Sequence, residues 1–548
     1  MDHQVTDTDP AQPPADAGPA PEDGRLPAGY YADDVPFRSG VVQQQAPLTM
    51  AVVAALNGIN PPRPTGAFRY CDLGCGNGTT VNALAALYPE AEFVGVDFNA
   101  GHIEQARADA EAAGLTNVRF IQGSFADLDD ADLPPFDFIG MNGIYSWLDR
   151  DILPAVHRLV GRILRPGGLF YVEYMTMPGM IAVVPMWQLI QAMVPVDGRG
   201  SHERATRGLR VLEELSKSGM AYLDRHPTAK GATNGYVTTW HSNPNKIDHF
   251  AHNAMASGFR PRYVTEMCDE MAEAGLTFAG RTPMVFNDPD LTVTLQQATL
   301  LRGVEDRPTR ELLSDFMRNE RNRRDLFVKA GEGSDDPEAA RAFLTDEIGH
   351  MARAPSGTPV QPLQLPGPRK LPLLGAGYDR VIAAADGRAT TLAAANRDGE
   401  LSDDVLIAVG HRLQAGGQYF LCEPGYAGAP LPEAPARLQL TNPMNRVLLA
   451  RARADGSGMP VIARAVGGTA MTLDLIETAL LDGWLDAGYD GAVAHAQARF
   501  ADSQVKVKVN GEPRSLAALT ADELGQRLSA MARVRVPNLL RLGALAPS

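Results

Sequence analysis

The sequence predicts an α/β fold in which helices cover both faces of a mainly parallel sheet. From about residue 66 to 175, short apolar runs alternate with segments whose apolar residues recur at helical spacing, and the links between them are short. Such alternation is typical of parallel sheets, because the helix between two strands carries the chain back to the edge at which the first strand began. Acidic, glycine-rich or amide residues follow several of the apolar runs. Ligands of open α/β sheets bind outside the carboxyl ends of the strands, so we expect the functional site at this edge.

The elements follow one another in a regular order. Apolar runs predict strands at 68–73, 93–96, 118–121, 136–141 and 169–172, with helices expected at 79–88, 100–113 and 150–164. The second helix stops at Gly114, a residue common at helix C-termini. The alternation then breaks and resumes near 264–280. Residues 176–260 are therefore interpreted as an insertion before the last helix and strands of the sheet.

The flanking segments differ from this pattern. Residues 1–28 are rich in Asp, Glu and Pro and are expected to be a disordered acidic tail. We expect the main domain at 29–300, followed at 301–365 by a charged helical connector and a linker rich in Pro and Gly. Residues 366–548 show several helical patterns and are expected to form a C-terminal accessory domain.

Composition restricts the possible partners. The 548 residues carry a net charge of −15, which opposes the attraction to phosphate on which nucleic-acid binding relies, so no nucleic acid is expected. The four cysteines form no C-x-x-C pair, and no metal site is expected.

The longest uncharged apolar stretch, 181–196, is shorter than the about 20 residues of a membrane span. Because the N-terminus also lacks a signal-peptide pattern, we expect a soluble cytoplasmic protein.

The stretch D-L-G-C-G-N-G at 72–78 carries the most specific chemical signal. Its glycines let the backbone turn sharply and approach a ligand closely. A dinucleotide fingerprint has the order G-x-G-x-x-G, whereas here a glycine stands at every second position. This register disfavours a nicotinamide dinucleotide and favours S-adenosylmethionine, which has an ammonium group and no phosphate. The residues expected to bind it here are Asp72, Gly74, Cys75, Gly76, Asn77 and Gly78.

Further cofactor contacts are expected at the ends of the next strands. Asp97 ends the second strand, about 20 residues after the loop, where an acid can accept hydrogen bonds from both ribose hydroxyls, or else cap a turn. Phe98 could flank the adenine, and Ser124 could read its edge. Phe125 could stack on the adenine ring or simply belong to the core. Asn142, after the fourth strand, could hold the methionine part of the cofactor.

Three residues are candidates for catalysis. Tyr145, Glu173 and Tyr174 follow the fourth and fifth strands, where a methyl acceptor would lie. A carboxylate or phenol there could help an ammonium acceptor lose its proton, although methyl transfer can proceed largely by positioning. The alternative for Tyr145 is that it packs against the start of the next helix.

Two other patterns have competing interpretations. The methionines between 175 and 193 could form an adaptable lid over the acceptor, or a helix packed against the sheet edge. The D-H-x-x-H pattern at 248–252 has the spacing of metal ligands on a helix, but no convincing further ligand lies near it in the sequence.

The motifs as a whole resemble the class I S-adenosylmethionine-dependent methyltransferases. More narrowly, they resemble bacterial members that carry a methyltransferase regulatory domain, a group that includes protein lysine methyltransferases acting on outer-membrane proteins. The stretches that carry this resemblance are N-G-I-Y-S-W at 142–147, Y-V-E-Y-M-T-M-P-G-M at 171–180, residues 245–276, N-R-R-D-L-F-V at 322–328 and A-L-L-D-G at 479–483.

The resemblance implies a Rossmann-like seven-stranded methyltransferase sheet with a helical insertion. It also implies a regulatory-domain-like region at about 225–305 and a mostly helical C-terminal domain, for which a winged-helix-like arrangement is one option. The chain departs from the family at Gln45, where T-H-P is replaced by Q-A-P, and at Met175, where the family has Asn. The leading hypothesis is a methyltransferase for protein lysine. The alternatives are a methyltransferase for a small, partly apolar metabolite and a non-catalytic protein that binds S-adenosylmethionine.

Overall fold

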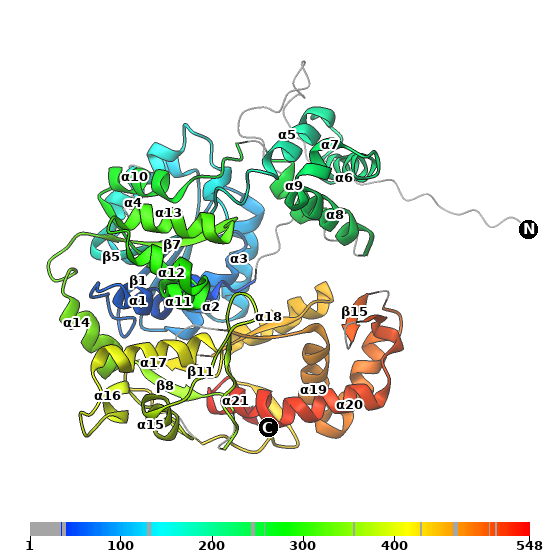
Figure 1. Ribbon diagram of the computed structural model, residues 1–548. Helices are drawn as coiled ribbons and strands as arrows, with labels where there is room; N and C mark the ends of the chain where they lie inside the picture. The colour runs from blue at the N-terminus through cyan, green and yellow to red at the C-terminus, as the bar shows by residue number, and fades with distance from the viewer. Residues whose placement is uncertain are drawn as a thin grey trace, which may run out of the picture. The chain divides into compact units, whose positions relative to one another are not determined.

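The computed structural model of the chain describes residues 34–35, 40–128, 133–242, 247–256, 258–354, 357–427, 430–463, 470–503, 505–509 and 512–548 (Figure 1). The chain divides into two compact units. One comprises Met1–Pro36 and Ala182–Gly258, and the other comprises Phe37–Ile181 and Phe259–Ser548. The tail expected at 1–28 lies outside the described residues.

The larger unit is built on a seven-stranded sheet with the strand order β3-β2-β1-β4-β5-β7-β6, which confirms the expected Rossmann-like sheet. Six strands run in one direction, and β7 is antiparallel to its neighbours β5 and β6. The strand order reverses between β1 and β4, the position where open α/β sheets bind ligands. The strands are β1 (Arg69–Leu73), β2 (Glu92–Asp97), β3 (Val118–Gln122), β4 (Phe136–Met141), β5 (Leu164–Met175), β6 (Leu276–Arg281) and β7 (Asn322–Lys329).

Strand β7 corrects one expectation from the sequence. The sequence predicts a charged helical connector at 301–365, beyond a boundary at 300, but residues 322–329 form an inner strand of the sheet. The strand was missed because its charged residues look like a solvated surface. Arg323 and Asp325 are instead buried and paired with each other.

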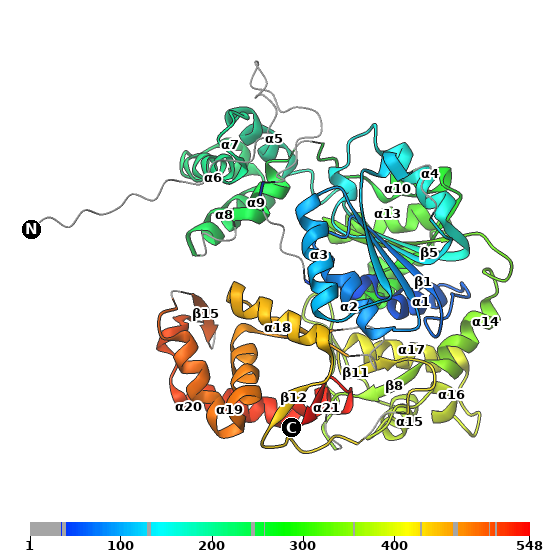
Figure 2. The same ribbon diagram turned by 180° about the vertical axis from the view of Figure 1, so that it is seen from behind.

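Helices cover both faces of this sheet (Figure 2). The side chains of α1, α2 and α3 pack with Tyr70 and Phe138 on one face, and those of α4 and α10 pack with Cys71 and Ile139 on the other. Since neighbouring strand residues point to opposite faces, each strand contributes to both cores. The helices are α1 (Pro47–Leu56), α2 (Thr79–Leu87), α3 (Ala100–Ala112), α4 (Leu153–Ile163), α10 (Val264–Glu273), α11 (Pro289–Thr292), α12 (Leu295–Arg302) and α13 (Arg307–Arg318).

The described helices of the smaller unit all fall within the segment expected as an insertion. Its helices are α5 (Val184–Met193), α6 (Ser201–Lys217), α7 (Ala221–Arg225), α8 (Pro227–Ser242) and α9 (Ile247–Ala254). The buried Arg204 donates to the carbonyl oxygens of Val194 and Met255, at 3.0 and 2.6 Å, and thereby ties α6 to the ends of α5 and α9. Met186 is buried in this unit, whereas Met193 is exposed.

The C-terminal region, from residue 337 onward, is mostly helical as expected, with short two-stranded sheets between the helices. No described helix in the chain is long and apolar enough to cross a membrane. The helices are α14 (Pro337–Ala342), α15 (Ala376–Ala384), α16 (Leu392–Ala395), α17 (Asp403–Ala415), α18 (Pro443–Asp455), α19 (Leu475–Phe500), α20 (Ala521–Ala530) and α21 (Val536–Arg541). The strands are β8 (Gly349–Ala352), β9 (Leu363–Gln364), β10 (Lys370–Leu371), β11 (Tyr419–Cys422), β12 (Leu438–Leu440), β13 (Met459–Ile462), β14 (Ala470–Leu473), β15 (Lys506–Val509), β16 (Glu512–Ser515) and β17 (Leu545–Pro547).

Candidate functional site

The glycine loop forms a tight turn between β1 and α2. The N–H groups of Gly74 and Cys75 both donate to the carbonyl oxygen of Val96, at 2.8 and 2.9 Å, which holds the loop against the end of β2. Gly74, Gly76 and Gly78 have φ angles of 76°, 53° and 69°, a left-handed conformation that residues with side chains rarely adopt. The glycine spacing is therefore required by the backbone path itself.

A Gly78→Ala substitution is expected to destabilise the protein by about 2–4 kcal/mol. Left-handed backbone costs about 1–2 kcal/mol for an L-residue, and overpacking adds about 1–3 kcal/mol. The added Cβ would lie 2.6 Å from Cβ of Ala106 and 3.0 Å from the ring of Phe120. Gly66→Ala is the matched control, because Gly66 has a similar φ of 65° and nothing within 4 Å of the added Cβ. Urea unfolding measures both variants, and equal losses would contradict the role given to close packing at Gly78.

Asp97 shapes the loop from the end of β2. Its Oδ2 accepts the N–H of Gly76 at 2.9 Å, and its Oδ1 accepts the N–H of Asn99 at 2.9 Å. Nδ1 of His102 lies 3.3 Å from the same Oδ1, a contact that the sequence did not indicate. An ionised carboxylate has about four acceptor positions, so Asp97 keeps acceptor capacity for a ligand.

Asp72 is buried at the end of β1, with 3% of its surface exposed. Its Oδ2 accepts a hydrogen bond from Nε2 of Gln45 at 3.3 Å, and no described cationic side chain pairs with it. Burial raises the pKa of Asp72 to about 7; the Gln45 hydrogen bond lowers it in part, and the charge of Asp97 raises it. Gln45 stands out in the sequence only as a departure from the family pattern, and its contact with Asp72 is found only in the structure.

The expected adenine-binding residues have different surroundings. Phe98 directly follows β2 and leaves 53% of its surface exposed, which is unusual for a large apolar side chain. Ser124 lies half-buried in the turn after β3, where its Oγ accepts the N–H of Ala126 at 3.4 Å. Phe125 is buried in the core on the α4 face, the alternative that the sequence left open. Phe98 therefore presents exposed apolar surface at the end of β2, on which an adenine ring could stack.

Asn142 and Glu173 come together at the carboxyl edge of β4 and β5. Oδ1 of Asn142 accepts the hydroxyl of Tyr171 at 2.9 Å. Glu173 forms an ion pair with Arg324 of β7 at 3.0 Å, and their side chains are 13% and 35% exposed. A Cβ added at Gly143 would lie 3.7 Å from the Glu173 carboxylate. The sequence does not indicate Arg324, because its charged segment predicts a helical connector and not a strand.

The two tyrosines proposed for catalysis are instead buried in the core on the α4 face. Tyr145 donates its hydroxyl to Oε2 of Glu270 at 2.5 Å and lies 2.9 Å from Nε2 of His157. Tyr174 donates to Oδ2 of Asp325 at 2.5 Å. Burial raises the pKa of each phenol above its usual value, and the neighbouring carboxylates raise it further. Neither hydroxyl is therefore suited to remove a proton near neutral pH.

The loop is also contacted by the C-terminal region. Arg451 of α18 donates to Oγ1 of Thr79 at 2.7 Å and pairs with Asp109 of α3. The same Thr79 hydroxyl donates to Oδ1 of Asn77 at 2.8 Å. An arginine more than 370 residues along the chain thus supports the last residues of the glycine loop.

The D-H-x-x-H pattern belongs to the smaller unit. Nε2 of His252 lies 2.9 Å from the carbonyl oxygen of Val35, and Asp248 lies 3.9 Å from Nδ1 of His202. Among the described residues, no group of three or more His, Cys, Asp or Glu side chains has the arrangement of a metal site.

Two family models match the part of the chain that forms the seven-stranded sheet. A family model described as a methyltransferase domain matches residues 65–203, and one described as a predicted methyltransferase regulatory domain matches residues 248–329. A trans-aconitate 2-methyltransferase of Methylobacterium radiotolerans is 30% identical over 197 residues, which are 35% of this chain and 68% of that relative. The chain belongs to the S-adenosylmethionine-dependent methyltransferases. The regulatory-domain match of this methyltransferase ends with β7, later than the region expected at about 225–305.

Two other similarities extend over more of the methyltransferase. An uncharacterized protein of Synechocystis is 33% identical over 303 residues, 55% of this chain, and the matched part spans 58% of that relative. The structure of PKMT2 from Rickettsia typhi in complex with AdoHcy has a TM-score of 0.61 at 16% identity and covers 93% of this chain and 100% of that chain. At this identity the likeness concerns the fold, and it includes the C-terminal region.

Proposed function

We propose that this methyltransferase binds its cofactor between the glycine loop and the ends of β2, β3 and β4, and transfers the methyl group to a protein lysine. The observation that carries the cofactor site is Asp72. It is a buried carboxylate beside the glycine loop with no described cationic partner, and its burial raises its pKa to about 7. An ammonium group placed there would supply the missing charge partner and favour the ionised acid.

The remaining expected residues fit the other parts of S-adenosylmethionine, which supplies an activated methyl group. The acceptor capacity that Asp97 keeps beside Gly76 and Asn99 suits the ribose hydroxyls. The exposed ring of Phe98 suits stacking on the adenine, with Ser124 at its edge and Phe125 beneath in the core. Asn142, held by Tyr171, suits the amino-acid end of the cofactor.

Glu173 is the favoured residue for the acceptor among those proposed from the sequence. It is the one whose carboxylate lies beside Asn142 and Gly143, whereas both tyrosine hydroxyls are occupied in the core. Arg324 fixes its orientation. Glu173 could orient an incoming ammonium group, and the overall charge of −15 favours a cationic acceptor such as lysine over an anionic one.

A small-molecule acceptor is the second candidate. It is favoured by the trans-aconitate 2-methyltransferases, three of which, from Methylobacterium radiotolerans, Methylobacterium nodulans and Deinococcus radiodurans, are 30–36% identical to parts of this chain. Incubation of a bacterial lysate with the protein and methyl-labelled S-adenosylmethionine distinguishes the two candidates. Methyllysine in protein hydrolysates supports the proposal, and label confined to small molecules rejects it in favour of the second candidate.

An Asp97→Ala variant tests the cofactor site. We expect it to bind S-adenosylmethionine about 10- to 150-fold more weakly, since hydrogen bonds to a charged group contribute roughly 1.5–3 kcal/mol. Glu104→Ala is the control, because Glu104 is an exposed acid on the following helix. Calorimetry measures both, and an unchanged affinity of Asp97→Ala would remove the ribose assignment.

A further inference from the structure

A cavity of about 210 Å³ lies at the start of α1, and no residue of the glycine loop lines it. Its walls come from the short helix η1 (Gln43–Gln45), the start of α1, the turn η5 (Met284–Asn287) after β6, and the C-terminal region. With about 30 Å³ for each water in the liquid, this is room for about seven waters. It is smaller than the about 300 Å³ at which pockets for drug-sized ligands begin. The cavity suits a small ligand.

The charged group in this cavity is Arg353, which follows β8. Its guanidinium stacks 4.2 Å from the ring centre of Phe420, and its Nε is buried without a hydrogen-bond partner among the described residues. None of the described carboxylates pairs with it. Burial and the positive charge of Arg535 lower the pKa of Arg353 to about 10, so it is still cationic at neutral pH. A partly buried guanidinium without an acid is an unusual arrangement, because buried charges are normally paired.

The other polar groups in the cavity are neutral. The side chains of Gln43, Gln44, Thr49 and Gln414 line it, and none of them carries a charge that could neutralise Arg353. Amides and hydroxyls can donate hydrogen bonds to an oxyanion beside a guanidinium. The lining therefore combines one permanent positive charge with several neutral donors.

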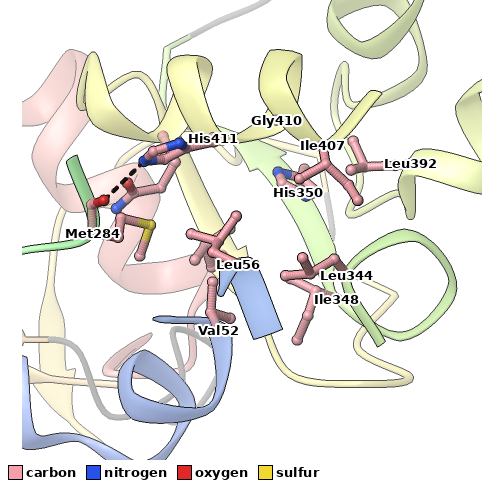
Figure 3. A pocket seen from close by; sticks show the side chains of 12 residues that line it. Val52, Leu56, Met284, Leu344, Ile348, His350, Leu392, Ile407, Gly410 and His411 are labelled. Carbon is pink, nitrogen blue, oxygen red and sulfur yellow. Dashed lines mark hydrogen bonds between the residues drawn. The ribbon is translucent and has the colours of Figure 1, made fainter. Parts of the chain in front are cut away.

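A second pocket next to this cavity differs from it in size and in lining (Figure 3). It shares Met284, Gln414 and Leu421 with the cavity, but it measures only about 20 Å³ and is lined mainly by apolar side chains. Burial lowers the pKa of both histidines in it, His350 and His411, and His411 contacts the carbonyl oxygen of Met284 at 3.1 Å. This pocket thus has neither the space nor the charge for an anion.

We infer that the cavity beside Arg353 is a second ligand site, which binds a small oxyanion, a carboxylate or a phosphate, held by the guanidinium and the surrounding amide and hydroxyl donors. The site is separate from the cofactor edge but not remote from it. Gln43 and Gln44 line the cavity, and the next residue, Gln45, donates to Asp72. A ligand in the cavity therefore contacts the same three-residue helix that contacts the cofactor site.

Calorimetric titration of the full chain with sodium phosphate and with sodium succinate, at constant ionic strength set by chloride, tests the inference. We expect saturable binding of at least one of them, and the preferred anion identifies the source of the oxyanion. Arg353→Gln is expected to weaken the binding by about tenfold or more, the scale of a lost charged hydrogen bond. Arg397→Gln, which removes an exposed arginine, is the matched control and should bind as the unaltered protein does.

A second variant covers the case in which Arg353→Gln does not fold. Ala415→Leu keeps the guanidinium and fills part of the cavity, so it should also weaken the binding. Absence of saturable binding of both anions to the unaltered protein would overturn the inference. So would equal affinities of the unaltered protein and both cavity variants.

Discussion

An Asp72→Asn variant is expected to bind S-adenosylmethionine roughly 10- to 150-fold more weakly at pH 8, because an amide cannot neutralise the ammonium group of the cofactor. The effect should depend on pH in the unaltered protein. The pKa of Asp72 is about 7, so the carboxylate that binds the ammonium group becomes populated as the pH rises through this value. Affinity should therefore increase between about pH 6 and 8, with release of a proton on binding.

Calorimetry in buffers of different ionisation enthalpy measures this proton release. Asp72→Asn should show a weak affinity that is flat across the same pH range. Glu90→Gln, an exposed acid before β2, is the control and should keep the pH dependence. A flat affinity in the unaltered protein would contradict the role of Asp72 as the ammonium partner.

The same substitution should stabilise the protein in the absence of cofactor. The pKa of Asp72 is raised from 3.8 in the unfolded chain to about 7 in the folded one, so the folded state binds more protons between these values. Stability from this group is present below about pH 4 and is lost as the pH rises toward 7. At pH 8 Asp72→Asn should exceed the unaltered protein in unfolding free energy by a few kcal/mol, at about 1.4 kcal/mol for each pKa unit. Urea unfolding at pH 5 and pH 8 measures the difference, which should shrink at the lower pH.

An Arg323→Met variant is expected to destabilise the fold by about 3–5 kcal/mol, the scale for removing one partner of a buried ion network. Arg323 is fully buried on β7 and contacts Asp325, Asp315 and Glu311 at 2.8, 2.8 and 3.1 Å. Burial alone would raise the pKa of Glu311, but Arg323 and the other arginines nearby outweigh it and hold that pKa at about 2. Without the guanidinium these carboxylates would be buried together without their common partner.

Arg321→Met, two residues earlier and exposed, is the matched control and should change stability by less than about 0.5 kcal/mol. Chemical unfolding at pH 7 gives both values. The deficit of Arg323→Met should shrink as the pH is lowered toward 5, because the carboxylates that have lost this partner can then take up protons. Equal stability of the two variants would show that the buried network contributes little.

The parts of the fold that follow local rules could be predicted from the sequence. The alternation of strands and helices up to β5 follows from apolar periodicity, and the glycine loop follows from the backbone conformation that glycine allows. Both are determined by short stretches of sequence. Strand β7 could not be recognised, because its buried Arg323 and Asp325 resemble surface residues until their partners are known. Those of Arg323 include Asp315 on α13, and those of Asp325 are Arg323 and Tyr174. Burial of charge is a property of the assembled structure.

The candidate site, too, could be predicted from the sequence only in part. The loop and Asp97 are specified by their positions at strand ends, but the roles of Gln45, His102 and Arg324 depend on contacts made by other elements. Glu173 and Tyr174 are neighbours in the sequence, yet they point to opposite faces of the sheet, toward the edge residues and into the core. A position at the end of a strand does not tell which of two neighbours faces the ligand.

The contact between Arg451 and Thr79 has a consequence for how such enzymes can be shortened or recombined. A fragment ending after β7 would contain every strand of the seven-stranded sheet. It would lack Arg451, whose guanidinium donates a hydrogen bond to Thr79 at the end of the glycine loop. Grafting a foreign C-terminal half would have the same effect unless it supplied an equivalent guanidinium. In this chain the glycine loop therefore takes part of its support from a residue that lies well beyond the last strand of the sheet.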